Sequence, residues 1–193
     1  ILSGLVGSEM CIRDRRYKLY GSSSWTGVDT GLPVREGAWQ HVALTRAAST
    51  NSVNFYLDGQ LSYTGTADGA GTGSINNSSA AFVVGGSASP AGTFNGSIDE
   101  VRLYASVRSA SEIAADIKTY GPTATTGTNT LNAYFDFNEG TSGSAASGSI
   151  YNRALGAPST SFLSAHGSPT YSGIESTQVI AGKHVVSFPR SYI

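Results

Sequence analysis

Two neighbouring carboxylates and three histidines are the residues whose chemistry could serve catalysis: Asp99, Glu100, His41, His166 and His184. A glycoside hydrolase needs two carboxylates that flank one scissile bond. Adjacent side chains of a strand point to opposite faces, so Asp99 and Glu100 cannot act together across one bond. The histidines are scattered along the sequence, and no nucleophile motif accompanies them. The sequence therefore predicts that this chain is not an enzyme.

Aromatic side chains offer a second kind of chemistry, which is the stacking of a sugar ring. Trp25 lies in the serine- and glycine-rich stretch GSSSWTG at 21–27, where nothing else needs burying. We expect an exposed indole there, with the neighbouring hydroxyls as hydrogen-bond partners for a pyranose. Tyr20 and Tyr63 are weaker candidates for the same role. The alternative is that Trp25 folds back onto the core as an edge residue.

The composition favours an all-β, turn-rich protein. The chain of 193 residues contains 24 glycines, and only 13% of its residues are charged. The formal net charge is −1 with both signs interspersed, so no basic patch of the kind that binds nucleic acid is visible. No apolar run approaches the ~18 residues of a membrane span, and the single cysteine provides no disulfide framework. We expect neither a nucleic-acid partner nor membrane insertion.

The stretch from Trp39 to Gly65 predicts a β-hairpin. Two runs, 39–46 and 53–57, alternate with a period of two and are rich in β-branched and aromatic residues. Asp58-Gly59 follows the second run. This dipeptide suits a two-residue turn in which both central residues have positive φ. The chain is therefore expected to fold back on itself at this point.

Further elements are expected downstream of the hairpin. The segments 81–86 and 96–104 predict strands, the first of them short and buried. Glu100 and Arg102 lie two residues apart in the second strand, so we expect a structural charge pair. Residues 109–118 predict the one helix, because Ser109 and Glu112 have the spacing of a capping box. Alternation returns at 131–140 and predicts another strand.

Four motifs give the chain a family resemblance: WQHVALTR at 39–46, NSVNFYLDGQL at 51–61, GSIDEVRLY at 96–104 and SASEIAA at 109–115. In this order, over roughly residues 17–120, they resemble a laminin-G-like, concanavalin A-like domain. The resemblance implies an all-β fold, an antiparallel jelly-roll β-sandwich with one short helix. It also implies a non-catalytic, extracellular module of a larger secreted or surface protein that binds carbohydrate or matrix.

The partner implied by this resemblance is a glycan or an extracellular protein. Two alternatives stay open. The domain could be a structural or adhesive spacer without a small ligand, or it could be an accessory domain of a secreted glycoside hydrolase. A glycan array separates a binder from a spacer, and the full open reading frame decides the last alternative.

The resemblance further implies a structural calcium ion, bound by carboxylates and backbone carbonyls. Asp99 and Glu139 are the candidate ligands. Members that bind the ion tend to carry an aspartate in the loop after the opening strand, whereas the loop at 141–149 has no acid here. Alternatively, backbone N–H groups satisfy the carboxylate of Asp99. Where family members usually have leucine before the helix, this chain has Arg108, and we expect this difference to weaken the docking of the helix.

The domain organisation is expected to follow four segments. Residues 1–15 lack any pattern, and SEMCIRDR at 8–15 resembles the translated adapter sequence at the ends of assembled environmental reads, so we expect a non-native leader; a real terminus is the alternative. Residues 16–120 resemble the back part of a jelly roll, 121–130 a linker, and 131–193 the front part of a jelly roll. The front part either completes the same sandwich, as in a circular permutation, or begins a second one.

Overall fold

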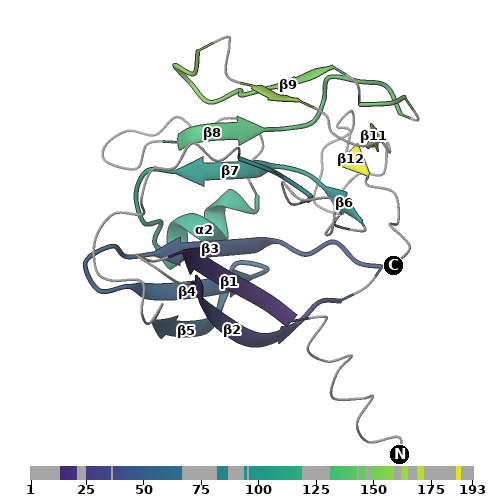
Figure 1. Cartoon of the computed structure of the whole chain (residues 1–193). Coiled ribbons are helices and arrows are strands. Elements are labelled where there is room, and N and C mark those ends of the chain that lie inside the picture. Colours follow the sequence, from purple (N-terminus) through teal and green to yellow (C-terminus); the bar gives the residue numbers. More distant parts are fainter. Residues whose placement is uncertain are drawn as a thin grey trace, which may run out of the picture. The chain divides into compact units, whose positions relative to one another are not determined.

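The computed structural model describes residues 14–20, 25–35, 37–66, 82–86, 94, 96–118, 131–142, 144–146, 148–158, 162–164, 169–171 and 186–187, with the backbone alone for 14–20, 25–28, 171 and 186–187. These residues form antiparallel strands and one short helix (Figure 1), which confirms the predicted all-β class. The chain divides into two compact units. Unit 1 is drawn from Ile1–Asn77 and Val107–Ile117, and unit 2 from Ser78–Ser106 and Lys118–Ile193.

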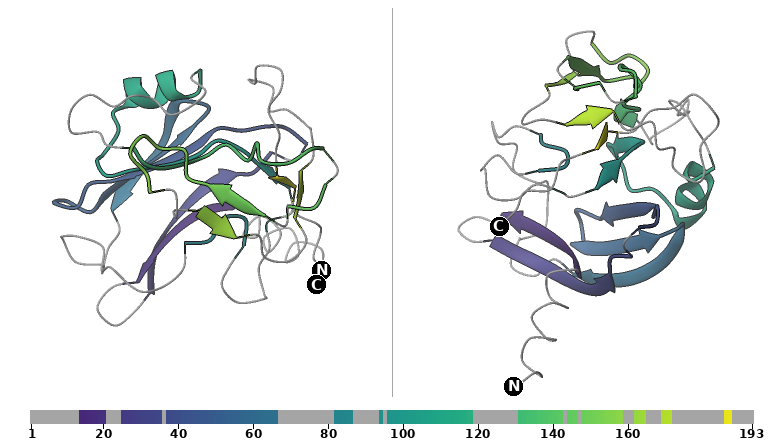
Figure 2. Two further views of the ribbon diagram at one scale, coloured as in Figure 1. Left: turned by 90° about the horizontal axis from the view of Figure 1, so that it is seen from above. Right: turned by 90° about the vertical axis from the view of Figure 1, so that its right-hand side faces the viewer.

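Unit 1 consists of a two-stranded ladder, a three-stranded sheet and the helix. The ladder pairs β1 (Asp14–Tyr20) with β2 (Trp25–Pro33), and the sheet has the order β3 (Val42–Arg46), β4 (Ser52–Leu57), β5 (Gln60–Thr66). The strands β3, β4 and β5 run side by side in Figures 1 and 2. Because β1 begins at Asp14, the last two residues of the expected leader lie in a strand. Residues 1–13 lie outside the described part of the chain.

The predicted hairpin is confirmed in β4 and β5. Asp58 and Gly59 both have positive φ, 49° and 80°, as a primed two-residue turn requires. Val53 and Phe55 are buried, and Leu32 and Tyr63 pack against them. The strand expected at 39–46 begins only at Val42, so that part of the prediction is wrong. Trp39, Gln40 and His41 precede the strand without belonging to it.

Replacing Gly59 by valine is expected to destabilise the fold by more than the roughly 1 kcal/mol of a strained turn alone. Besides its positive φ, a Cβ at this position would lie 2.8 Å from Ile117 Cδ1 and 3.4 Å from Ala114 Cα. The end of the Ile117 side chain would therefore have to move away from the turn. Urea denaturation of Gly59→Val measures the change in unfolding free energy. Gly37→Val is the control, because Gly37 also has positive φ but a Cβ there would meet no described atom within 4 Å. The difference between the two variants gives the part of the loss that is due to the clash. Equal losses in the two variants would contradict the packing argument.

The helix α2 (Ala110–Asp116) begins with the predicted capping box. Ser109 accepts a hydrogen bond from the backbone of Glu112, and Glu112 accepts one from the backbone of Ser109, at 2.7 Å. The described contacts of Arg108 lie within the helical segment, so the expectation that this residue weakens the docking of the helix stays a prediction. Arg108 donates to both carboxylate oxygens of Asp116 and to Glu112, with its side chain only 12% exposed. The arginine therefore ties the start of the helix to its last turn.

Unit 2 is built from short strands. They are β6 (Ser97–Ile98), β7 (Val101–Tyr104), β8 (Leu131–Phe135), β9 (Ser149–Tyr151), β10 (Phe162–Ser164), β11 (Thr170–Tyr171) and β12 (Val186–Ser187). β7 pairs with β8, β9 with β10, and β12 lies between β6 and β11. All of these pairings are antiparallel.

Two strand predictions in unit 2 are wrong. Residues 82–86 form no strand, and Phe82 and Val83 are 49% and 41% exposed rather than buried. The single strand expected at 96–104 is divided into β6 and β7. Glu100 interrupts it with a φ of 55°, and its N–H donates to the side chain of Asp99 at 2.9 Å. A left-handed residue turns the chain, so the ladder cannot continue through it.

β8 carries more buried residues than the other described strands of unit 2. On one face, Ala133 and Phe135 belong to a cluster with Phe137, Ile150 and Val101. On the other face, Tyr134 is 1% exposed and packs in a cluster with Leu131 of β8 and with neighbours from two further segments: Tyr104 of β7, and Ala154 with Ala157. A strand covered on both faces fixes its register firmly, because a slip of one residue would exchange the two sets of side chains.

Two ladders of unit 2 join strands from both segments that resemble parts of a jelly roll. β7 lies in the back part and β8 in the front part, and β6 and β12 are likewise drawn from the two parts. Whether the front part completes the same sandwich or begins a second one stays open. The domain boundaries themselves, including the linker at 121–130 that lies outside the described residues, stay predictions.

Candidate functional site

The three aromatic residues predicted to stack a sugar lie in unit 1. Trp25 opens β2 and is the register partner of Tyr20, which closes β1, so the backbones of the two residues face each other at one end of the ladder. Their side chains lie outside the described part of the chain. Tyr63 of β5 is half-buried, and its ring meets Phe55 edge to face at a centroid distance of 6.1 Å. Tyr63 therefore contributes to the core, whatever its other roles.

The two predicted calcium ligands lie in unit 2, and each already accepts a hydrogen bond. Asp99 Oδ1 accepts the N–H of Glu100, and Glu139 Oε1 accepts the N–H of Tyr151 at 3.1 Å. Glu139 also pairs with Arg153, whose positive charge opposes a divalent cation. Within the described residues, no group of three acidic, histidine or cysteine side chains could hold a metal ion. Calcium binding stays a prediction that these contacts do not favour.

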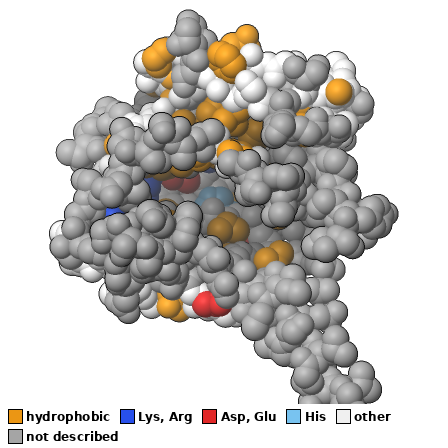
Figure 3. Space-filling view, viewed as in Figure 1, with side chains coloured by type: hydrophobic (Ala, Val, Ile, Leu, Met, Phe, Trp, Pro, Cys, Tyr) orange, Lys and Arg blue, Asp and Glu red, His pale blue; other side chains and the backbone are white. Residues whose placement is uncertain are grey.

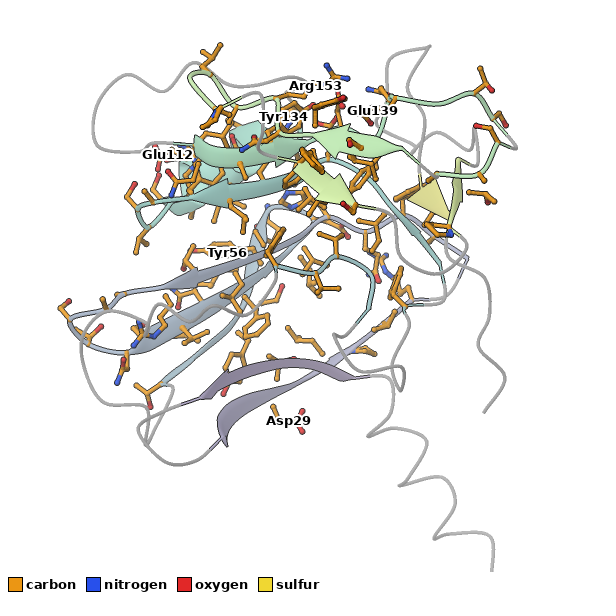
Figure 4. All side chains as sticks on the ribbon, turned by 45° about the horizontal axis from the view of Figure 1, so that its top comes forward. Asp29, Tyr56, Glu112, Tyr134, Glu139 and Arg153 are labelled. Atoms are coloured by element: carbon orange, nitrogen blue, oxygen red, sulfur yellow. The ribbon has the colours of Figure 1, made fainter. Side chains whose placement is uncertain are left out.

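Asp136, Glu139 and Arg153 form an acid–arginine cluster that sequence reasoning did not identify. Arg153 Nε donates to Asp136 Oδ1 at 3.0 Å, and its Nη2 donates to Glu139 Oε1 at 3.1 Å. The carboxylates are 15% and 12% exposed, whereas the arginine is 42% exposed. Figure 4 shows Arg153 and Glu139 next to each other in unit 2, close to Tyr134. The arginine of the cluster is therefore accessible to solvent, whereas its two carboxylates are largely buried.

The electrostatics of the cluster single out Glu139. Burial raises the pKa of Glu139 above its ordinary value, and the charge of Asp136 adds to this effect. The N–H of Tyr151 and the charge of Arg153 oppose it without cancelling it. A carboxyl group with a raised pKa is typical of a general acid. Here, however, Glu139 Oε1 is occupied, and Oε2 is buried and has no hydrogen-bond partner among the described residues. Glu139 therefore has no oxygen that is both exposed and unpaired among the described residues.

Arg153 is held in place through its neighbour Asn152 and through β8. Asn152 Oδ1 accepts the N–H groups of Tyr134 and Ala154, and its Nδ2 donates to the carbonyl of Asn132, each at 3.0 Å. The N–H of Arg153 donates to the carbonyl of Tyr134 at 2.8 Å. The segment after β9 is thus fastened to a buried strand. A guanidinium on such a segment has a preorganised position.

The outer side of β9 and β10, formed by Ser149, Tyr151, Phe162 and Ser164, is called the β9–β10 face here. Tyr151 pairs with Phe162 and Ser149 with Ser164 in the ladder. The two rings are 47% and 46% exposed, with centroids 6.3 Å apart at an angle of 62°. The intervening pair, Ile150 and Leu163, packs into the core instead. The face therefore presents two aromatic rings beside two serines.

The β9–β10 face continues toward the acid–arginine cluster. Tyr151 connects the two, because its backbone N–H binds Glu139 and Arg153 follows it by two residues. Hydrophobic side chains gather at the surface in the upper part of Figure 3, where Figure 1 draws β8 and β9. An exposed aromatic pair with a fixed guanidinium at one end and hydroxyls at the other can stack a ring and bind its polar groups.

Comparison with protein families matches residues 13–114, more than half of the chain, to the concanavalin A-like lectin/glucanases superfamily. No curated protein and no solved structure matches the chain significantly. The helix in the described residues is too short and too polar to cross a membrane. Antiparallel strands with one short helix agree with the β-sandwich of that superfamily. The chain therefore belongs to the concanavalin A-like lectin/glucanase superfamily.

Proposed function

We propose that this chain is a non-catalytic, extracellular module that binds carbohydrate through the β9–β10 face. The observation that carries the proposal is the exposed Tyr151–Phe162 pair. Buried rings stabilise a fold, whereas two neighbouring rings that each remain nearly half exposed leave apolar area for a ligand. The name of the superfamily includes lectins, which bind sugars. A glycan or a glycosylated matrix protein is the partner that this chemistry fits.

Two features support a binding role over hydrolysis. The face offers rings and hydroxyls but no pair of accessible carboxylates. The two acids beside it are largely buried and bound to Arg153. Hydrolysis would instead require one carboxyl group on each side of the scissile bond. A spacer without a ligand and an accessory domain of a larger enzyme remain the alternatives, and both leave this segment non-catalytic.

The proposal is tested by replacing Tyr151 with alanine and measuring binding on a glycan array. We expect Tyr151→Ala to lose about 2 kcal/mol or more of binding free energy, which lowers affinity at least about 30-fold. Because the ring is 47% exposed, the melting temperature of the variant should differ little from that of the unmodified chain. Phe94→Ala is the matched control, since Phe94 is an equally exposed aromatic residue (46%) of unit 2 outside the face.

Trp25→Ala is measured in parallel, because it tests the other aromatic candidate. Loss of binding in Trp25→Ala, with Tyr151→Ala unaffected, would move the site to the end of the β1–β2 ladder and contradict the proposal. An array without signal for the unmodified chain would favour the spacer.

A further inference from the structure

Resting on the proposed function, we infer that Asp136 and Glu139 make the β9–β10 face selective for neutral glycans over acidic ones. The two carboxylates do so by occupying Arg153 and by leaving excess negative charge behind it. They are specificity-determining residues that need not touch the sugar themselves.

The face extends along the strands, so it fits a chain of sugars better than a single ring. Ser149 and Tyr151 lie two residues apart on β9, which is about 7 Å along a strand. Arg153 follows at the same parity, and both Tyr151 and Arg153 are exposed while Ile150 and Ala154 are buried. Hydroxyls, aromatic rings and a guanidinium therefore follow one another in a row. An oligosaccharide can meet all three in turn.

A half-exposed arginine beside aromatic rings would ordinarily attract an acidic group. Guanidinium groups bind carboxylate or sulfate through two parallel hydrogen bonds. In this chain the Nε and Nη2 of Arg153 already donate to Asp136 and Glu139. The remaining side-chain nitrogen of Arg153, Nη1, has no hydrogen bond to any described residue. It can therefore donate to a sugar hydroxyl.

The charge balance of the cluster points the same way. With both acids ionised, two negative charges face one positive charge, so the cluster carries a net charge of −1. A uronate or sulfate group that approached Arg153 would meet carboxylates that are already paired, and repulsion between like charges would weaken its binding. A neutral sugar has no such cost. Selectivity of this kind comes from a repulsive element against the wrong ligand.

The test compares the unmodified chain with the double variant Asp136→Asn/Glu139→Gln. These amides keep an oxygen acceptor for Arg153 and for the N–H of Tyr151 while removing both charges. The probes are a neutral β-glucan hexasaccharide, a galacturonate hexasaccharide and a sulfated heparin hexasaccharide. We expect the unmodified chain to bind the neutral probe best. The double variant should keep that affinity within about threefold and gain roughly tenfold or more for an acidic probe, a gain that 1 M salt removes.

Asp29→Asn controls for the loss of negative charge outside the cluster: it removes one such charge, from unit 1, where the double variant removes two from the cluster. It should leave the preference among the probes unchanged. The single variant Asp136→Asn repeats the measurement should the double variant fail to fold, as judged by its melting curve. A gain of acidic-probe binding in either variant supports the inference.

The failures of the two proposals are distinguishable. If the unmodified chain binds a neutral glycan and an acidic one equally well, or if neither variant gains affinity for an acidic probe, the selectivity is wrong while carbohydrate binding stands. If the unmodified chain binds no glycan and Tyr151→Ala changes nothing, the proposed function falls and the selectivity with it. Binding of an unglycosylated protein to the face would have the same consequence.

Discussion

Replacing Tyr134 by alanine is expected to cost about 3–5 kcal/mol of folding free energy, because a large buried ring is removed from unit 2. Tyr134 is 1% exposed, and its hydroxyl donates to Glu100 Oε1 at 2.8 Å. Its ring lies 5.0 Å from the guanidinium carbon of Arg102. Arg102 and Glu100 pair at 2.6 Å, with side chains 8% and 13% exposed, which confirms the charge pair expected from the sequence. Tyr134 thus contacts both members of the buried ion pair, Glu100 through its hydroxyl and Arg102 through its ring.

The variant Tyr134→Phe separates the hydroxyl from the ring. It keeps the packing and the contact with Arg102 but removes a hydrogen bond to a charged group, so we expect a loss of about 1.5–3 kcal/mol. Urea denaturation measures both variants. Tyr151→Ala is the control for removal of a tyrosine ring, and it should cost far less because Tyr151 is half exposed. If Tyr134→Ala and Tyr151→Ala proved equally stable, Tyr134 could not have the buried position described here.

The second large effect is expected for Arg108→Leu, which introduces the leucine that the family resemblance leads us to expect at this position. Asp116 is 9% exposed on its side chain and receives three of the hydrogen bonds of Arg108. Removing the arginine leaves a buried carboxylate without its cation, and such a loss typically costs about 3–5 kcal/mol. Leucine therefore should destabilise the helix rather than improve its docking.

A second substitution makes this prediction specific. In Arg108→Leu/Asp116→Ala the buried charge is gone, so most of the lost stability should return. Glu112 keeps its capping contacts with Ser109 in both variants. Arg35→Leu is the matched control, because Arg35 pairs with Asp58 at the surface with side chains 61% and 43% exposed, and such a pair contributes about 0–1 kcal/mol. No recovery in the double variant would show that the arginine acts by packing instead.

Local chemistry explains which parts of the fold were predictable. The turn at Asp58-Gly59 and the capping box of Ser109 and Glu112 depend on residues that are close in sequence, and both are confirmed. The break at Glu100 was not predictable, because nothing in GSIDEVRLY marks a glutamate for positive φ. Its conformation is stabilised by a contact with Tyr134, which lies 34 residues away.

The candidate site was missed for a related reason. Arg153 reaches Asp136 and Glu139 across 17 and 14 residues, so no short motif joins them. The strands β9 and β10 have three residues each, too few for alternation to stand out. The segments SIY at 149–151 and FLS at 162–164 did contain a signal. In each of them an inward apolar residue, Ile150 or Leu163, lies between two residues that point outward. Recognising it required knowing that these two short segments pair with each other.

The pairing of β7 with β8 has a consequence for synthesis on the ribosome. β3, β4 and β5 find all their described ladder partners among residues 42–66, so their sheet can close early. β7 emerges with its hydrogen-bonding edge toward β8 unoccupied until Leu131–Phe135 has followed it. Partly synthesised chains that end between these strands therefore carry an open edge, which is a template for pairing with other chains. Translation pauses in this interval should favour aggregation more than pauses elsewhere.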